Sequence, residues 1–261
     1  MRKKIFPTLI ILTSALLVVS CGMIISTIAQ SKAQIDAFEE LAILVQTPTE
    51  ATDGEVPDET NPNLDTSPKP IFTRNLTPLF EKNSDCLGWI CIPGTAIDYP
   101  LMHTPSEPHK YLRKNFDRKY SVAGVPFLQE NNTLDSVNLI IYGHNMKNGT
   151  MFADIAKYRS KSYCAEHPTI ELETKQGLKL YDVFAVVQVK NNDAWYNFVE
   201  AVDESDYRNK VEEILSRALY DTGVTSQYGQ QLITLSTCYG STKNDRLIVI
   251  GVEISAEGKI E

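Results

Sequence analysis

The sequence predicts a mainly β fold with peripheral helices, preceded by one membrane-spanning helix. From about residue 87 onward, short apolar runs are divided by glycine and proline. One amphipathic stripe interrupts these runs, and an uncharged apolar segment occupies the N-terminus of the 261-residue chain. Many short strands with turn residues between them are typical of a β-barrel or a β-sandwich.

The N-terminal segment predicts a membrane anchor and the side of the membrane on which the rest of the chain lies. Basic residues 2–4 precede Ile5–Ala29, which contains no charged residue. About 20 apolar residues cross a bilayer, and basic flanks stay cytoplasmic. We therefore expect residues 1–30 to form a cytoplasmic flank and a single transmembrane helix, with an extracellular folded domain. The alternatives are a cleaved signal peptide, whose apolar core is shorter at about 7–15 residues, and a lipobox at Val18–Cys21.

Two segments of different character separate this anchor from the folded domain. Residues 31–46 carry apolar residues at three- and four-residue steps, which predicts an amphipathic helix. This helix either continues the membrane helix or packs on the domain. Residues 47–70 hold five prolines, six acidic residues and no aromatic residue. Such a composition cannot bury enough apolar surface to fold alone, so we expect a disordered linker before a folded domain over residues 71–261.

The folded domain is predicted to contain strands throughout, with helices between some of them. The apolar runs that predict strands are 89–92, 97–102, 125–128, 137–142, 169–172, 179–190, 232–237 and 246–254. Short helices are expected at Phe72–Glu81 and Met151–Tyr158. A longer helix is predicted by the stripe of Val211, Ile214, Leu215, Ala218 and Leu219. Asp203 or Ser205 is its expected cap, and Gly223 its expected end.

Composition and motif content argue against several function classes. The net charge of −8 argues against nucleic-acid binding, which usually needs a clustered basic face. The histidines form no HExxH pattern and the cysteines no paired CxxC, so we expect no metal and no cofactor. The acidic group Asp203, Glu204 and Asp206 is interpreted as a solvated helix start rather than a calcium site. No G-x-S-x-G nucleophile elbow is present.

One of the five cysteines has a context that suits catalysis. Cys86, Cys91 and Cys164 are interpreted as structural residues, with a Cys86–Cys91 disulfide as the alternative. Cys238 instead follows the apolar run Leu232–Thr237. A thiol attacks carbonyl carbon as the thiolate, and a free cysteine has a pKa of about 8.5. Cys238 therefore needs a base beside it at neutral pH.

His144 and Arg246 are the predicted partners of Cys238, because each also lies at the tip of an apolar run. A neutral imidazole accepts the thiol proton, and the charged ring protonates a leaving amine. If the strands on either side of residues 239–245 pair as antiparallel neighbours, Arg246 faces Cys238. Its guanidinium can then hold an oxyanion. The alternative is a solvated Arg246 paired with Asp245.

Three separated motifs resemble those of a class B sortase: TLSTC at 234–238, YGHNMKNGTMF at 142–152, and Arg246 at the start of the last strand. The resemblance extends from about Leu87 to Glu253. Sortases are membrane-anchored cysteine transpeptidases of Gram-positive bacteria. The resemblance implies an eight-stranded sortase-type β-barrel with a helix inserted before the strand of Cys238.

The resemblance also implies a reaction and its partners. The three residues Cys238, His144 and Arg246 are implied to be catalytic. They would cleave a C-terminal sorting motif of a secreted protein after threonine. The acyl group would pass through a thioester to an amine of the peptidoglycan cross-bridge or its precursor. The substrate-binding positions implied by the resemblance are Thr237, Ser236, Tyr142 and Leu112.

Three other functions are left open by the sequence. A class B pilus polymerase would join pilin subunits through a lysine, and a cysteine peptidase would use water as the acceptor. A tethered binding module without catalysis is the third, against which the presence of the whole catalytic set argues.

Overall fold

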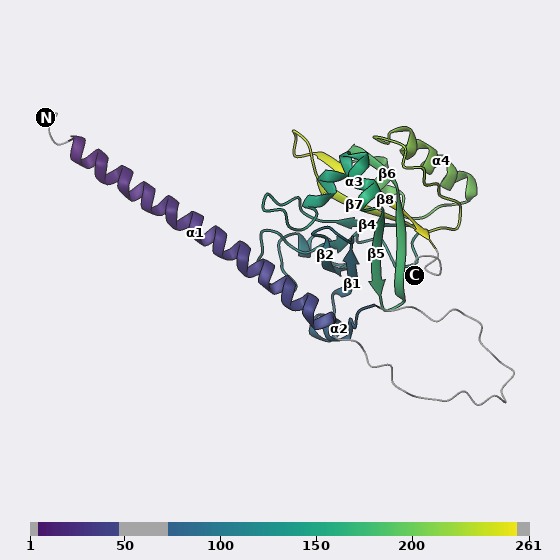
Figure 1. Cartoon of the computed structure of the whole chain (residues 1–261), viewed down its shortest axis with the longest axis horizontal. Coiled ribbons are helices and arrows are strands. Elements are labelled where there is room, and N and C mark those ends of the chain that lie inside the picture. The colour runs from purple at the N-terminus through teal and green to yellow at the C-terminus, as the bar shows by residue number, and fades with distance from the viewer. Residues whose placement is uncertain (1–4, 47–72, 255–261) are drawn as a thin grey trace, which may run out of the picture. The chain divides into compact units, whose positions relative to one another are not determined.

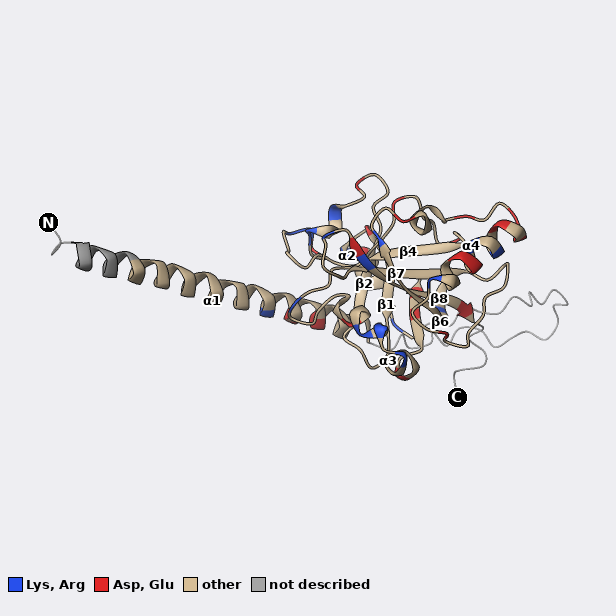
Figure 2. Ribbon diagram, turned by 90° about the horizontal axis from the view of Figure 1, so that it is seen from above, with Lys and Arg blue, Asp and Glu red and all other residues tan. Residues whose placement is uncertain are grey.

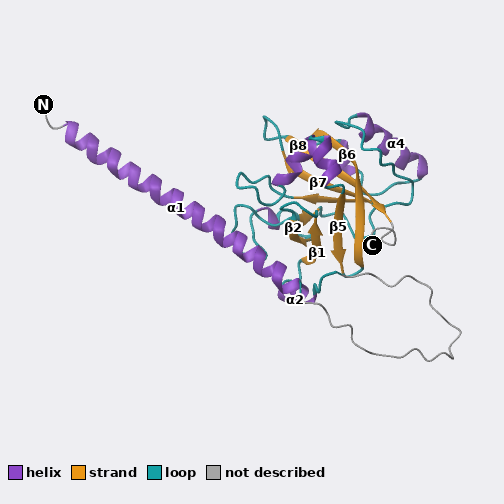
Figure 3. Ribbon diagram, viewed as in Figure 1, coloured by secondary structure: helices purple, strands orange, loops and turns teal. Residues whose placement is uncertain are grey.

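The computed structural model describes residues 5–46 and 73–254, with side chains in the first segment described from Thr13 onward. The chain divides into two units, Met1–Leu41 and Ala42–Glu261. The predicted linker at residues 47–70 lies outside the described residues. The strands and helices of the larger unit are shown in Figures 1 and 3.

Helix α1 (Ile5–Val45) is a single helix of 41 residues. The apolar segment and the predicted amphipathic segment after it are therefore continuous. No charged residue precedes Lys32 within the helix, and Figure 2 shows charged residues on its described part only near the end that leads to residue 45. The portion Thr13–Val45 is long and apolar enough to cross a membrane. A membrane anchor and a signal sequence both fit this finding.

Eight strands form a closed barrel in the order β1-β2-β3-β4-β7-β8-β6-β5. This confirms the predicted eight-stranded barrel. The strands β2 and β3 pair in parallel, as do β4 and β7, and every other neighbouring pair is antiparallel. The strand bounds are β1 Cys86–Cys91, β2 Asp98–Met102, β3 Phe127–Leu128, β4 Asn138–Tyr142, β5 Thr169–Thr174, β6 Gly177–Lys190, β7 Leu232–Cys238 and β8 Asp245–Ile254.

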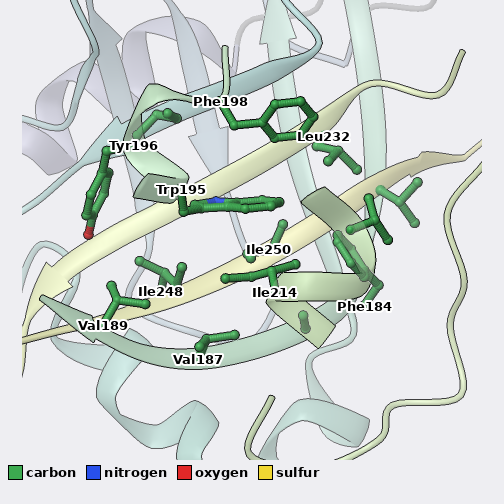
Figure 4. Close-up of a cluster of buried hydrophobic side chains, with 14 of the residues drawn as sticks. Phe184, Val187, Val189, Trp195, Tyr196, Phe198, Ile214, Leu232, Ile248 and Ile250 are labelled. Carbon is green, nitrogen blue, oxygen red and sulfur yellow. The ribbon is translucent and has the colours of Figure 1, made fainter. Parts of the chain in front are cut away.

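Most of β4, β7 and β8, together with residues 183–187 of β6, is buried on both faces. One face lines the barrel interior, and the other is covered by the connection between β6 and β7. That connection contains the 3₁₀ helix η4 (Ala194–Asn197) and helix α4 (Glu204–Ser216). Figure 4 shows Trp195 of η4 and Ile214 of α4 beside Ile250 of β8. Burying both faces explains the continuous apolar runs Leu139–Ile141, Val183–Val187 and Leu247–Ile250 in these strands.

Helix α4 confirms the predicted inserted helix but ends earlier than expected. Asp203 is the N-cap, and its side chain accepts a hydrogen bond of 2.8 Å from the Asp206 amide. The helix ends at Ser216 rather than near Gly223. The reason is that the Leu219 amide donates to the Val186 carbonyl of β6 at 2.9 Å, which takes this residue out of the helix.

The shorter helices also differ in detail from the sequence predictions. Helix α2 covers Thr77–Lys82, so it starts later than predicted. The segment predicted as a helix at Met151–Tyr158 is the 3₁₀ helix η3 (Ala153–Arg159). Met151 has a positive φ of 57°, which is incompatible with a helix starting there. The remaining short elements are η2 (Lys110–Leu112) and α3 (Lys161–Glu166).

The cysteines form no disulfide within the described residues. All five are free thiols, so the alternative Cys86–Cys91 bridge is absent there. Cys86 and Cys164 are buried, as expected of structural cysteines.

The described part of the chain after residue 72 begins with a buried carboxylate contact. Glu173 on β5 has an exposed fraction of 0%. It accepts hydrogen bonds from the amide and hydroxyl of Thr73, both at 2.7 Å, and from the Arg74 amide at 2.9 Å. The Arg74 guanidinium lies 3.4 Å from the same carboxylate. A buried charge needs such partners, so Thr73 and Arg74 are fixed to the barrel through Glu173.

Candidate active site

The strand register places His144, Cys238 and Arg246 in one row at the end of the barrel. In the parallel pair β4–β7, Tyr142 aligns with Ser236, and His144 and Cys238 each follow two residues later. In the antiparallel pair β7–β8, Cys238 aligns directly with Arg246. Neighbouring strands lie about 4.8 Å apart, so the backbone places the three predicted residues at the same end of three adjacent strands.

Hydrogen bonds continue the alignment of β4 and β7 past their last paired residues. The Gly143 amide donates to the Ser236 carbonyl at 3.1 Å, and the Thr237 hydroxyl donates to the Gly143 carbonyl at 2.8 Å. The Asn145 side-chain amide donates to the Cys238 carbonyl at 3.0 Å. The backbone on both sides of His144 is therefore fixed to the backbone around Cys238.

His144 is half-buried, and its orientation is set by a backbone carbonyl. Nε2 lies 3.0 Å from the Leu112 carbonyl oxygen. Because a carbonyl only accepts, Nε2 carries the hydrogen and Nδ1 is the nitrogen that can take a proton. Burial lowers the pKa of His144, the Leu112 carbonyl opposes this, and the Arg113 charge lowers the pKa further. The neutral ring, which can act as a base, is therefore favoured at neutral pH.

Cys238 is exposed, unlike the rest of its strand. The residues from Leu232 to Thr237 are buried, so the thiol reaches solvent where β7 leaves the core. Cys86 and Cys91, the two cysteines of β1, are less accessible than Cys238. Burial raises the pKa of Cys86 and of Cys91 to about 12, and nearby Asp98 adds to the rise at Cys91. These two thiols are poor nucleophiles at neutral pH.

Arg246 is held by the loop that precedes it in the chain. Its Nη1 donates to the Lys243 and Asp245 carbonyl oxygens, both at 2.9 Å. The ion pair between Arg246 and Asp245 considered as an alternative is not formed, because the Asp245 carboxylate pairs with Lys190 instead. A guanidinium has five N–H donors, so one nitrogen can bind the loop while the others face a ligand. A hollow of about 440 Å³ adjoins Arg246, bounded by Gln188–Lys190, Asp193, Tyr239–Ser241 and Asp245.

The predicted substrate-binding residues differ in accessibility. Leu112 is 37% exposed and Tyr142 is half-buried. Ser236 and Thr237 are each 1% exposed, and the Ser236 hydroxyl lies 2.8 Å from the Tyr196 hydroxyl. Their roles in substrate binding stay predictions. The Ser236 hydroxyl therefore joins β7 to η4, and the Thr237 hydroxyl joins β7 to the residue that follows β4.

Sequence reasoning missed several residues that support the site. Gln129 accepts from the Tyr142 hydroxyl at 2.5 Å and donates to the Tyr196 carbonyl at 3.1 Å, which links β4 to η4. No motif marks either Gln129 or Tyr196. Asn145 could have been found, since it directly follows His144 in the matched string.

The acidic residues at the start of α4 are engaged in helix capping and in one ion pair along the helix. Asp203 caps the helix, Glu204 pairs with Arg208 at 2.6 Å, and Asp206 accepts from the Val202 amide at 3.1 Å. Among the residues that the structure describes, no group of three or more His, Cys, Asp or Glu side chains is arranged to hold a metal ion.

Comparison with known proteins assigns this arrangement to one family. A family model described as the sortase domain matches residues 90–254. Sortase B of Listeria monocytogenes is 36% identical over 167 residues, which cover 62% of this chain and 66% of that protein, just under two thirds. Sortase B of Staphylococcus aureus is 28% identical over 185 residues, covering 67% of this chain and 75% of that protein.

Solved structures agree in fold with this chain. A Staphylococcus aureus sortase B-substrate complex has a TM-score of 0.64 at 27% identity, covering 69% of this chain and 84% of that chain. Sortase B of Clostridium perfringens has a TM-score of 0.65 at 28% identity, covering 69% of this chain and 100% of that chain.

Proposed function

The chain belongs to the sortase family, and on this basis we propose that it is a cysteine transpeptidase whose catalytic residues are Cys238, His144 and Arg246. The observation that carries the proposal is their alignment in one row across β4, β7 and β8. A nucleophile, a base and an oxyanion donor within reach of one another are what acyl transfer requires.

In the first half of the reaction, the peptide carbonyl is attacked. The Cys238 thiol gives its proton to Nδ1 of His144, and the thiolate forms a bond to the carbonyl carbon of a threonine in the sorting motif. The carbonyl π electrons move to oxygen, where the Arg246 guanidinium stabilises the negative charge. As the tetrahedral intermediate collapses, the C–N bond breaks and the His144 imidazolium protonates the departing amine. A thioester to Cys238 remains.

In the second half of the reaction, an amine replaces the Cys238 sulfur on the acyl group. The amine attacks the thioester carbonyl and gives a proton to His144, and the Cys238 sulfur leaves as the thiolate. One amide bond has been exchanged for another, so the reaction needs no ATP.

The proposed substrates are a secreted protein with a C-terminal sorting motif and an amine of the peptidoglycan cross-bridge or precursor. A solved sortase B complexed with triglycine supports an amino group as acceptor. A pilin lysine, for a class B pilus polymerase, or water, for a peptidase, are the alternatives. The apolar length of α1 supports a single-pass anchor. We propose that it leaves the N-terminus in the cytoplasm and the catalytic domain outside, with a linker at 47–70 between them.

The test uses the full chain in detergent with internally quenched peptides that carry candidate sorting motifs. Reactions with and without triglycine or a lysine derivative are analysed by mass, with Cys238→Ala as the control. A ligated product that is lost in Cys238→Ala supports the proposal. Hydrolysis unchanged by every amine favours the peptidase. Cleavage that persists in Cys238→Ala refutes the assignment of Cys238.

A further inference from the structure

The loop between β7 and β8 is organised around the Asp245 carboxylate. One carboxylate oxygen pairs with the Lys190 ammonium at the end of β6. The other accepts from the Thr242 amide at 2.8 Å, and the Asp245 amide donates to the Thr242 carbonyl at 3.1 Å. The Asp245 side chain is only 17% exposed. The carboxylate therefore ties the loop to itself and to β6.

Gly240 makes room for this carboxylate. A Cβ atom at residue 240 would lie 2.6 Å from the Asp245 Cβ and 2.8 Å from its Oδ2. Gly240 also has a φ of 119°, in the region that favours glycine. Residue 240 is therefore glycine where the loop backbone packs directly against the Asp245 side chain.

The same loop holds the Arg246 guanidinium. Nη1 of Arg246 binds the carbonyl oxygens of Lys243 and Asp245, and the Asp245 carbonyl also accepts from the Tyr239 amide at 3.1 Å. A continuous set of contacts therefore runs from Lys190 through the Asp245 carboxylate and the loop backbone to Arg246.

We propose that Lys190 and Asp245 are positioning residues, which hold the β7–β8 loop so that the Arg246 guanidinium is directed at the oxyanion formed on the Cys238 adduct. This inference rests on the proposed function, because it assumes the role of Arg246. Donors that are fixed before the reaction stabilise a transition state without a cost of reorganisation. The pair acts through Arg246 and does not itself contact the reacting atoms.

The pair is expected to affect catalysis much more than stability. The Lys190 side chain is 60% exposed, and exposed ion pairs contribute little to folding. Hydrogen bonds from Lys190 and from the Thr242 amide hold the pKa of Asp245 at about 2. The carboxylate therefore stays charged at every pH at which His144 is neutral, and the pair adds no pH dependence of its own near neutrality.

The barrel supplies a matched control pair on the same two strands. Lys179 on β6 lies 3.3 Å from Glu253 on β8. Tyr181 aligns with Glu253 at one end of this strand pair, and Lys190 aligns with Asp245 at the other. Substitutions at Lys179 and Glu253 remove the same kind of ion pair without touching the loop or Arg246.

The experiment compares Lys190→Met and Asp245→Asn with Lys179→Met and Glu253→Gln in the full chain in detergent. Three quantities are measured: kcat and KM for the peptide, and the rate at which iodoacetamide alkylates Cys238. Alkylation needs the thiolate but forms no oxyanion. We expect Lys190→Met and Asp245→Asn to lower kcat about tenfold, less than the roughly 10²–10³-fold typical of losing an oxyanion donor outright. KM, the alkylation rate and both control variants should change less than about twofold, and Lys190→Arg should restore most of kcat.

The outcomes separate this inference from the proposed function. If the wild type is active but the Lys190 and Asp245 variants have the same kcat as the control variants, the inference is overturned and the proposed function stands. If kcat and the rate of Cys238 alkylation fall by the same factor, the inference is also overturned, because the substitutions would then act on the thiol or on the fold. A wild type without Cys238-dependent product overturns the proposed function, and the inference falls with it.

Discussion

Replacing Gly143 with alanine should misplace His144 while leaving the three proposed catalytic side chains unchanged. A Cβ atom at residue 143 would lie 2.5 Å from Cγ and 2.6 Å from Cδ2 of Phe152. Carbon atoms prefer about 3.5–4.0 Å, so the backbone or the ring must move by about 1 Å. Phe152 is fully buried, which leaves the backbone before His144 to take up much of the shift.

The clash sets the expected losses of thermal stability and of catalytic rate. Overpacking a buried site typically costs about 1–3 kcal/mol, and 1 kcal/mol lowers Tm by about 2–4 °C in a domain of this size. A misplacement of about 1 Å at a catalytic group costs up to about 10²-fold in rate. We therefore expect Gly143→Ala to lower Tm by about 5 °C and kcat/KM by about 10- to 100-fold.

Gly251→Ala is the matched control for this prediction. Its Cβ would lie 2.9 Å from the Tyr181 Cβ and 3.1 Å from Ile233 Cγ2, inside the barrel and away from the site. It should lower Tm but keep kcat/KM of the folded protein within about twofold. Melting curves and peptide-cleavage kinetics below the melting range measure both quantities. If Gly143→Ala loses stability but keeps its activity, the backbone at residue 143 does not control the position of His144.

Three further predictions address other parts of the molecule. Limited iodoacetamide should label Cys238 before Cys86, whose pKa burial raises to about 12; comparable labelling in peptide mapping would contradict this. Burial lowers the pKa of His144, so the acid limb of kcat/KM should lie below about pH 6.5. Arg113→Gln removes a charge that lowers this pKa, so the limb should move to higher pH, and a shift to lower pH would refute the argument. Glu173→Gln cannot accept every hydrogen bond now made to the carboxylate, so it should destabilise the domain by about 1–3 kcal/mol. In denaturant titrations this is measured as a lower midpoint, with specific activity unchanged; an unchanged midpoint would show that the contact is not needed.

The strands could be predicted because their signal is local. Each of the eight apolar runs became a strand, with bounds that shifted by only a few residues. The end of α4 could not be predicted, because a hydrogen bond from Leu219 to Val186, distant in sequence, decides it. The 3₁₀ form of the segment after Met151 likewise depends on a backbone conformation that its residue types do not specify.

The reactive residues of the candidate site could be predicted, because their residue types and motifs are visible in the sequence. A cysteine, a histidine and an arginine, each at the tip of an apolar run, indicated a candidate set, and the motif resemblance to class B sortases was needed to select these three residues. Their supports were not predictable, because Gln129 and Tyr196 act through contacts between distant segments. The ion pair between Asp245 and Arg246, considered only as the alternative to a catalytic Arg246, does not form, because the strand register places Lys190 of the adjacent strand opposite Asp245.

The contact of Thr73 and Arg74 with Glu173 also determines how mechanical load enters the domain. Tension on the chain N-terminal to these residues reaches the barrel at β5, through hydrogen bonds to one buried carboxylate. In the closed order of strands, β6 and β8 lie between β5 and β7. In the proposed tethered arrangement, a pull entering by this route would cross the β5–β6 and β6–β8 ladders before it reaches Arg246 on β8, and one further ladder, β8–β7, before it reaches Cys238.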